Sequence, residues 1–203
     1  KDGKPFKTRD GGVMRLETLI QETKDEMYRK IREGREMSEE EAREVADQVA
    51  VSALLYGDLS NQASKDYIFD PDKFTSFEGD TGPYILYTIV RIKSILAKYK
   101  EQGGELAGLT LQEASGESEK ALMMTLVQFH AMMQSAAEET APHRVCAYIY
   151  ELANAFNHFY HETKILAEEN REKREGLIAL LLLTRDVLET CIHVLGFSAP
   201  EKM

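Results

Sequence analysis

Two segments of the sequence group side chains that suit the binding of phosphates or of unpaired nucleobases. In the first, residues 7–12, Lys7 and Arg9 flank Thr8, and two glycines follow just ahead of a helical pattern. Cations, a hydroxyl and free backbone amides at such a place can hold phosphate. The spacing is not that of a Walker loop. Because most short basic loops are merely solvated, the pattern by itself does not decide the role of this one.

The second segment is a helical pattern that starts after Pro142. Leu152 and Phe156 lie on its apolar side, whereas the polar side carries aromatic and amide groups. Aromatic rings stack on unpaired bases, and amides hydrogen-bond to base edges. Since these residue types are also common on half-buried helices, spacing alone leaves both interpretations open. The polar side consists of Tyr150, Asn154, Asn157, Tyr160 and His161.

Other constellations carry little chemistry. His158 and His161 have a spacing at which both can face one metal, but only Glu162 is close enough in sequence to join them. Structural zinc sites take four ligands, so we predict no metal site. Cys146 and Cys191 fall on apolar helix faces and are expected to pack as small hydrophobes.

Composition limits the class of protein. The chain has 203 residues, of which 43% are hydrophobic and 30% charged, as expected for a globular domain. Its 25 basic and 35 acidic residues give a net charge of −10. This charge argues against a protein that coats nucleic acid, but it does not exclude a locally basic or aromatic face. The longest apolar run, at 177–183, is far shorter than the ~18 residues that indicate a membrane span.

The elements that position these groups are predicted to be helices, which makes the fold all-α. Two helical patterns, beginning near Leu16 and at Ser38, come first, and Ser38 and Glu41 have the spacing of a capping box. Residues 57–82 are expected to be irregular with one short helix, and residues 67–69 could form a short strand. Apolar residues then recur at steps of three and four, which predicts a helical bundle. Its long helices are expected near 83–101, 117–138, 143–162 and 171–195.

Four stretches, in this order, resemble the C-terminal part of bacterial arginyl-tRNA synthetases, a class I family. Residues 3–12 (GKPFKTRDGG) are similar to the degenerate KMSKS loop of that family. Residues 56–70 (YGDLS, then KDYIFD) and 77–84 (FEGDTGPY) resemble the segments that follow it. Residues 142–160 and the tail at 195–203 resemble its α-helical anticodon-binding domain. The resemblance covers essentially the whole chain, and the polar start at Lys1 suggests a part of a longer protein.

This resemblance implies a division of the chain and an activity. Residues 1–80 would be the C-terminal end of a catalytic domain, and residues 81–203 the anticodon-binding domain. The family ligates arginine to tRNA(Arg) with ATP and Mg²⁺, and we expect a cytoplasmic monomer without a DNA or membrane partner. No HIGH motif or series of Rossmann strands is present, so this chain alone is expected to be inactive.

The resemblance also implies roles for individual residues. Lys7 and Arg9 would be transition-state cations, and Tyr160 and Met203 would enclose a flipped anticodon base. Two positions depart from the family pattern: Pro5 replaces the first lysine of the loop, and Leu86 replaces a glutamine, so Leu86 cannot hydrogen-bond as that side chain would. The implied ATP-binding residues are Phe6, Lys7, Thr8, Arg9 and Gly11. The implied tRNA-binding residues are Tyr84, Tyr87, Arg91, Asn154, Asn157, Tyr160 and Met203.

A second hypothesis is a stand-alone helical module that binds RNA or protein without catalysis. The loop at residues 6–12 argues against it, because a pure binding module has no use for that arrangement of cations and glycines.

Overall fold

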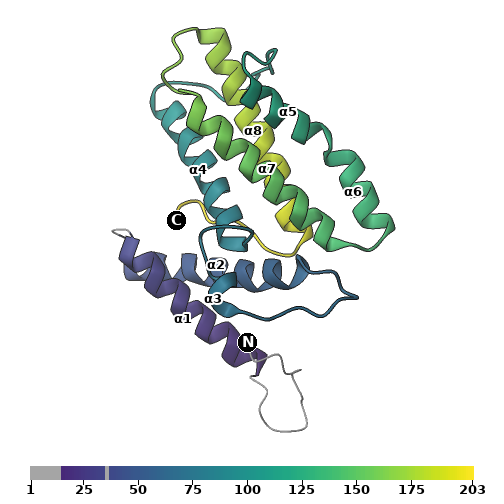
Figure 1. Ribbon diagram of the computed structural model, residues 1–203. Helices are drawn as coiled ribbons and strands as arrows, with labels where there is room; N and C mark the ends of the chain where they lie inside the picture. The colour runs from purple at the N-terminus through teal and green to yellow at the C-terminus, as the bar shows by residue number, and fades with distance from the viewer. Residues whose placement is uncertain (1–14, 35–36) are drawn as a thin grey trace.

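The computed structural model describes residues 15–34 and 37–203, and every regular element within these ranges is an α-helix. The predicted all-α fold is confirmed. Figure 1 shows α1 and α2 packed together at one end of the molecule, with the other long helices running side by side beyond them. The helices are α1 (Leu16–Gly34), α2 (Glu39–Leu59), α3 (Pro71–Phe74), α4 (Gly82–Glu101), α5 (Glu117–Val127), α6 (Phe129–Glu138), α7 (Pro142–Glu162) and α8 (Arg171–Val194).

Helix α2 begins with the capping box that the sequence predicts. The Ser38 hydroxyl accepts a hydrogen bond from the Glu41 N–H at 3.2 Å, and the Glu41 carboxylate accepts one from the Ser38 N–H. The alanines along α2 are fully buried, which lets other helices approach closely. At Gly82 a Cβ would lie 2.4 Å from the carbonyl oxygen of Ser52. Glycine therefore allows α4 to start directly against the backbone of α2.

Tyr56 fixes α2 to both helices that carry the predicted RNA-binding residues. Its side chain is fully buried. Its hydroxyl donates to Asp80 Oδ1 at 2.5 Å and lies 3.0 Å from the carbonyl oxygen of Cys146. Burial and the bond to Asp80 raise the pKa of this phenol above its ordinary value, so the hydroxyl keeps its proton. Because Asp80 precedes α4 and Cys146 lies in α7, one side chain sets the relation of three helices.

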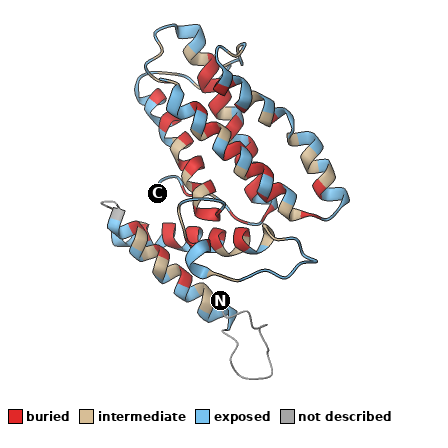
Figure 2. Ribbon diagram, in the orientation of Figure 1, coloured by how far each residue is buried: buried red, intermediate tan, exposed pale blue. Residues whose placement is uncertain are grey.

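The bundle core is built mainly by α4, α7 and α8. Figure 2 shows buried residues along all three helices. The predicted apolar positions of these three helices, including Ile89, Phe156 and Leu188, are all buried. Cys146 and Cys191 belong to this core as free thiols, which confirms the expectation for them. Burial raises the pKa of each thiol to about 12.

One predicted helix was wrong in its extent, because residues 117–138 form two helices that break at Gln128. The Gln128 N–H bonds to the carbonyl of Thr125, three residues back, at 3.2 Å, which tightens the turn. The apolar spacing continues across the break: Leu126 is buried, and the Phe129 ring lies 6.3 Å from that of Tyr148 in α7. The break therefore leaves no sign in the apolar period, and no proline or glycine marks it.

The possible strand at residues 67–69 was also wrong. This segment is irregular, and its aromatic side chains pack back onto neighbouring helices. The Tyr67 hydroxyl donates to Asp58 at 2.6 Å, and the Phe69 ring meets the Phe74 ring edge-on at 5.1 Å. A lone strand would have no partner within the described part of the chain. The short helix expected in this region is present as α3.

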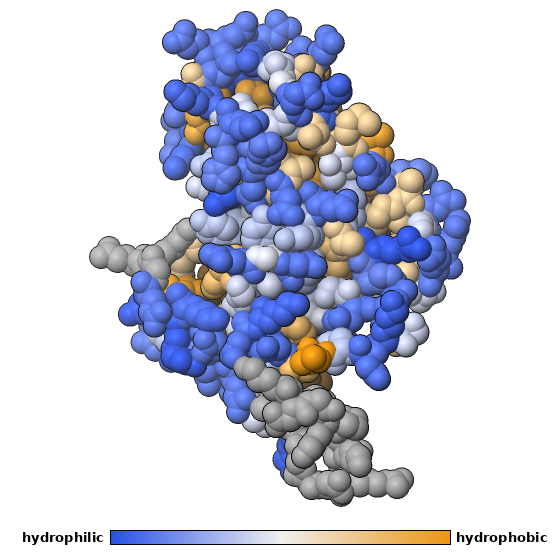
Figure 3. Space-filling model, in the orientation of Figure 1, coloured by the Kyte–Doolittle hydropathy of each residue, from blue (hydrophilic) through white to orange (hydrophobic). Residues whose placement is uncertain are grey.

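The surface is largely hydrophilic in the view of Figure 3, with apolar residues gathered over α5 and α6. Met124 and Val127 of α5 are among the exposed large apolar side chains. Within the described residues, no helix is both long and apolar enough to cross a membrane.

Candidate nucleic-acid interface

Six of the seven predicted tRNA-binding residues lie together where α4 and α7 pack against each other. The three on α4 are spaced by three and four residues, which places them on one side of that helix. The three on α7 are spaced by three, and hydrogen bonds and a cation–π contact join them to the residues of α4. We call this surface the α4–α7 face, and it consists of Tyr84, Tyr87, Arg91, Asn154, Asn157 and Tyr160.

A chain of hydrogen bonds orders this face. The Tyr84 hydroxyl donates to Asn154 Oδ1 at 2.7 Å and accepts from Asn157 Nδ2 at 2.9 Å. Asn157 Nδ2 also donates to the hydroxyl of Thr88 at 3.2 Å. Arg91 Nη1 donates to Asn157 Oδ1 at 2.5 Å. Because arginine has no acceptor, it fixes the Asn157 carbonyl toward itself and the amide nitrogen toward Tyr84.

Arg91 is the only cation of the α4–α7 face, and it has neutral neighbours. Its guanidinium carbon lies 4.8 Å from the centre of the Tyr87 ring and 5.2 Å from that of Tyr160. No described carboxylate is within ion-pair distance of it, although the chain is acidic overall. Ring faces attract a cation without neutralising it. The remaining N–H groups of the fork can therefore reach a ligand, such as a phosphate or the acceptor edge of a base.

Tyr160 offers an aromatic surface at the end of α7. The side chain is about one-third exposed (36%), and its ring stacks at 6.1 Å on the fully buried ring of Phe156. His161 lies next to it at 5.7 Å, and Tyr150 meets Tyr84 edge-on at 5.8 Å. A ring supported from behind and partly open to solvent is suited to base stacking.

Met203 does not lie on an open surface. It is 5% exposed and belongs to the hydrophobic core. The tail is held by Lys93, which bonds Glu201 at 2.7 Å, and by Lys202, which bonds Glu41 at 2.5 Å. Packing therefore accounts for a methionine at this position, and a contact of Met203 with a base stays a prediction. Leu86 is also fully buried and belongs to the core.

The predicted ATP-binding residues Phe6, Lys7, Thr8, Arg9 and Gly11 lie outside the described residues. Their roles stay predictions. In the described part of the chain, no group of three or more histidine, cysteine or acidic residues could hold a metal ion. His158 instead lies 3.7 Å from Glu162, one turn further along α7.

Thr88 lies beneath the α4–α7 face and supports it, and the sequence analysis did not predict this role. It is fully buried, donates to the Tyr84 carbonyl at 3.0 Å and accepts from Asn157. Its position one turn after Tyr84 is the only signal in the sequence, and that spacing also fits a core residue.

The chain matches two family models and a large set of relatives. The model described as "DALR anticodon binding domain" matches residues 85–203, and that described as "tRNA synthetases class I (R), catalytic domain" matches residues 1–71. An arginine–tRNA ligase from Agathobacter rectalis is 61% identical over 100% of this chain, and one from Alkaliphilus oremlandii is 51% identical over 100%. The chain spans only 35% and 34% of their respective lengths.

Solved structures agree with these matches. The arginyl-tRNA synthetase of Thermus thermophilus superposes with a TM-score of 0.84 and 29% identity, covering 95% of this chain and 33% of that one. The arginyl-tRNA synthetase of Plasmodium falciparum gives a TM-score of 0.82 at 25% identity, covering 94% of this chain and 34% of that one.

Proposed function

We propose that this chain, which belongs to the arginyl-tRNA synthetase family and contains its DALR anticodon-binding domain, binds the anticodon arm of an arginine tRNA through the α4–α7 face. The observation that carries the proposal is Arg91, a cation without a carboxylate partner that lies between two tyrosine rings. Splayed, unpaired bases are recognised by such a combination of ring stacking and hydrogen-bond donors.

The net charge of −10 is compatible with this role because the site is local. One stacked base is worth roughly 1–3 kcal/mol, and a guanidinium that binds a base or phosphate adds to it. A few contacts of this size give a usable affinity without a basic surface.

We test the proposal by titrating the chain with a synthetic anticodon arm of an arginine tRNA, and with an arm whose anticodon triplet is that of another amino acid. Removing two or three specific base contacts should weaken binding by at least about tenfold. Equal affinity for the two arms would overturn the proposal.

The wider activity is proposed for a longer protein, because this chain spans only 35% and 34% of the two arginine–tRNA ligases that it matches. There the family would join arginine to tRNA(Arg) with ATP and Mg²⁺, in the cytoplasm and as a monomer. Lys7 and Arg9 would stabilise the negative charge that develops as pyrophosphate leaves, with Phe6, Thr8 and Gly11 completing the ATP contacts.

In a full-length ligase carrying this sequence, Lys7→Ala or Arg9→Ala should slow ATP–pyrophosphate exchange by about 10²–10³-fold, the usual cost of one charge-stabilising group. The thermal midpoint should hardly change, because both residues lie in a polar, glycine-flanked stretch. Lower stability with normal exchange per folded molecule would show that the two residues serve folding instead.

A further inference from the structure

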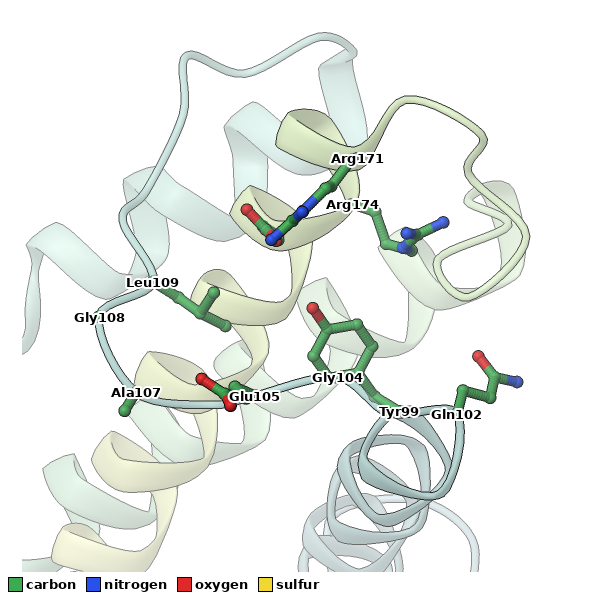
Figure 4. A pocket seen from close by; sticks show the side chains of 11 residues that line it. Tyr99, Gln102, Gly104, Glu105, Ala107, Gly108, Leu109, Arg171 and Arg174 are labelled. Atoms are coloured by element: carbon green, nitrogen blue, oxygen red, sulfur yellow. The ribbon is translucent and has the colours of Figure 1, made fainter.

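A second polar cavity lies at the end of the bundle, outside the α4–α7 face. It has a volume of about 830 Å³ and opens between the last turn of α4, the segment at 102–109 and the first turns of α8. In Figure 4 the Tyr99 hydroxyl points toward the first turns of α8, where Arg171 and Arg174 extend to either side. The size of the cavity is in the range of small-ligand sites.

Tyr99 presents an unused polar group to this cavity. The residue is only 6% exposed, and Gly104 lies so close to the ring that a Cβ there would be 2.3 Å from it. The hydroxyl points toward the first turns of α8 in Figure 4, and no hydrogen bond to another described side chain or carbonyl is formed by it. The ring is packed, but the hydroxyl oxygen is not among the buried polar atoms without a partner, so it is open to solvent at the cavity and can bond to a ligand there.

Charged groups of both signs surround the hydroxyl. Arg171 pairs with Glu175 at 2.7 Å. Arg174 donates to the carbonyl of Glu168 at 2.8 Å and has no carboxylate partner in the described part of the chain. Glu105 lines the cavity from the loop side. Two arginines and two glutamates suit a ligand that presents donors and acceptors together, as a nucleotide does, better than a bare anion.

The cavity lies within reach of a strand bound at the α4–α7 face. Tyr99 follows Arg91 by eight residues on the same helix, a rise of about 12 Å. Arg174 bonds to the connector between α7 and α8, which leaves α7 shortly after Tyr160. A single strand spans such a distance within a few nucleotides.

We infer that this cavity is a second nucleotide site, which takes an unpaired nucleotide from the same RNA loop whose base stacks on Tyr160. The inference rests on the proposed function. Tyr99 supplies a hydroxyl to the sugar or base of that nucleotide, and Arg174 supplies a cation to its phosphate or to the acceptor edge of its base.

The test measures the affinity of the chain for the synthetic anticodon arm by fluorescence anisotropy. Tyr99→Phe, which removes only the hydroxyl, should weaken binding about three- to tenfold, and Arg174→Gln about tenfold. The matched control is Arg144→Gln, because Arg144 is paired with Glu139 at the opposite end of α7. This control should change affinity less than twofold. Arms with one abasic loop nucleotide then locate the contact: one of them should abolish the effect of Tyr99→Phe.

The outcomes separate this inference from the proposed function. If Tyr160→Ala weakens binding while Tyr99→Phe and Arg174→Gln behave like Arg144→Gln, the second site is wrong and the α4–α7 face stands. If the arm does not bind to the unaltered chain, both are wrong. Circular dichroism melts of each variant verify that the fold is retained.

Discussion

Two arginines in different parts of the molecule cover tyrosine rings in nearly the same way. Arg43 on α2 lies 4.7 Å from the centre of the Tyr28 ring of α1, and Arg91 lies 4.8 Å from that of Tyr87. Arg43 is also paired with Glu39 at 3.0 Å, whereas the hydrogen-bond partner of Arg91 is a neutral amide. The first charge is compensated within the protein, and the second is available to a ligand.

The difference shows why total charge is a poor guide to what this protein binds. Along α1 and α2 the lysines and arginines that pair do so with nearby acids, as Lys24 does with Asp47 at 2.9 Å. Exposed pairs of this kind contribute little to stability. Because the two charges of a pair largely cancel, the cation in it also attracts an anion only weakly. A cation whose neighbours are neutral attracts an anion even in an acidic protein.

We expect the largest effect at Arg91. Arg91→Gln should weaken binding of the anticodon arm about 10- to 100-fold and make the affinity less dependent on salt, because a cation that meets the RNA is lost. Arg43→Gln removes the same charge over a similar ring and should change the affinity less than twofold. Equal losses for the two variants, measured by salt titrations of the dissociation constant, would mean that only net charge matters.

The next largest effect should come from giving Arg91 the carboxylate partner that it lacks. Asn157→Asp places a negative charge against Arg91, and the hydroxyls of Tyr84 and Thr88 can rotate to donate to it. Affinity for the arm should fall about tenfold, whereas the thermal midpoint should not decrease. Asn154→Asp adds the same charge to the same face without touching Arg91, so it should cost about twofold. If both aspartates weaken binding equally, pairing of Arg91 is irrelevant.

The smallest effect is expected for Glu41 of α2, where the charges are paired within the protein. Hydrogen bonds from Lys202 and from Ser38 lower the pKa of Glu41 below its ordinary value near 4.5. Its contribution to stability is thus present above that value and is lost as pH falls through the lower pKa of the folded state. Glu41→Gln keeps a capping box but cannot titrate. The thermal midpoint, measured from pH 6 to about pH 2, should fall less steeply for the variant, and the RNA affinity at pH 7 should be unchanged. Identical pH profiles of the two proteins would show that Glu41 does not contribute to the acid sensitivity.

Much of this architecture could be predicted from sequence because its signals are local. The capping box at Ser38 and the apolar period of α4, α7 and α8 depend on neighbours within one or two turns, and the structure contains them. The break at Gln128 lies between two helices that both pack against α7, and no proline or glycine in the sequence marks it.

The candidate site divides in the same way. Spacing placed Asn154, Asn157 and Tyr160 on one side of a helix, and the resemblance added residues of α4. Neither could show that Arg91 lacks an acidic partner, because that is a property of elements far apart in sequence. The burial of Met203 and the unused hydroxyl of Tyr99 were missed for the same reason.

The central claim is that Tyr160 stacks on a base of the anticodon, and a double-mutant cycle tests it most directly. The dissociation constants of unaltered chain and Tyr160→Ala are measured for an arginine tRNA and for the same tRNA with its middle anticodon base changed. We expect Tyr160→Ala to cost about ten- to a hundredfold with the native base and less than threefold with the changed base, since both changes remove one interaction. The same loss with both tRNAs would contradict a contact and withdraw the site.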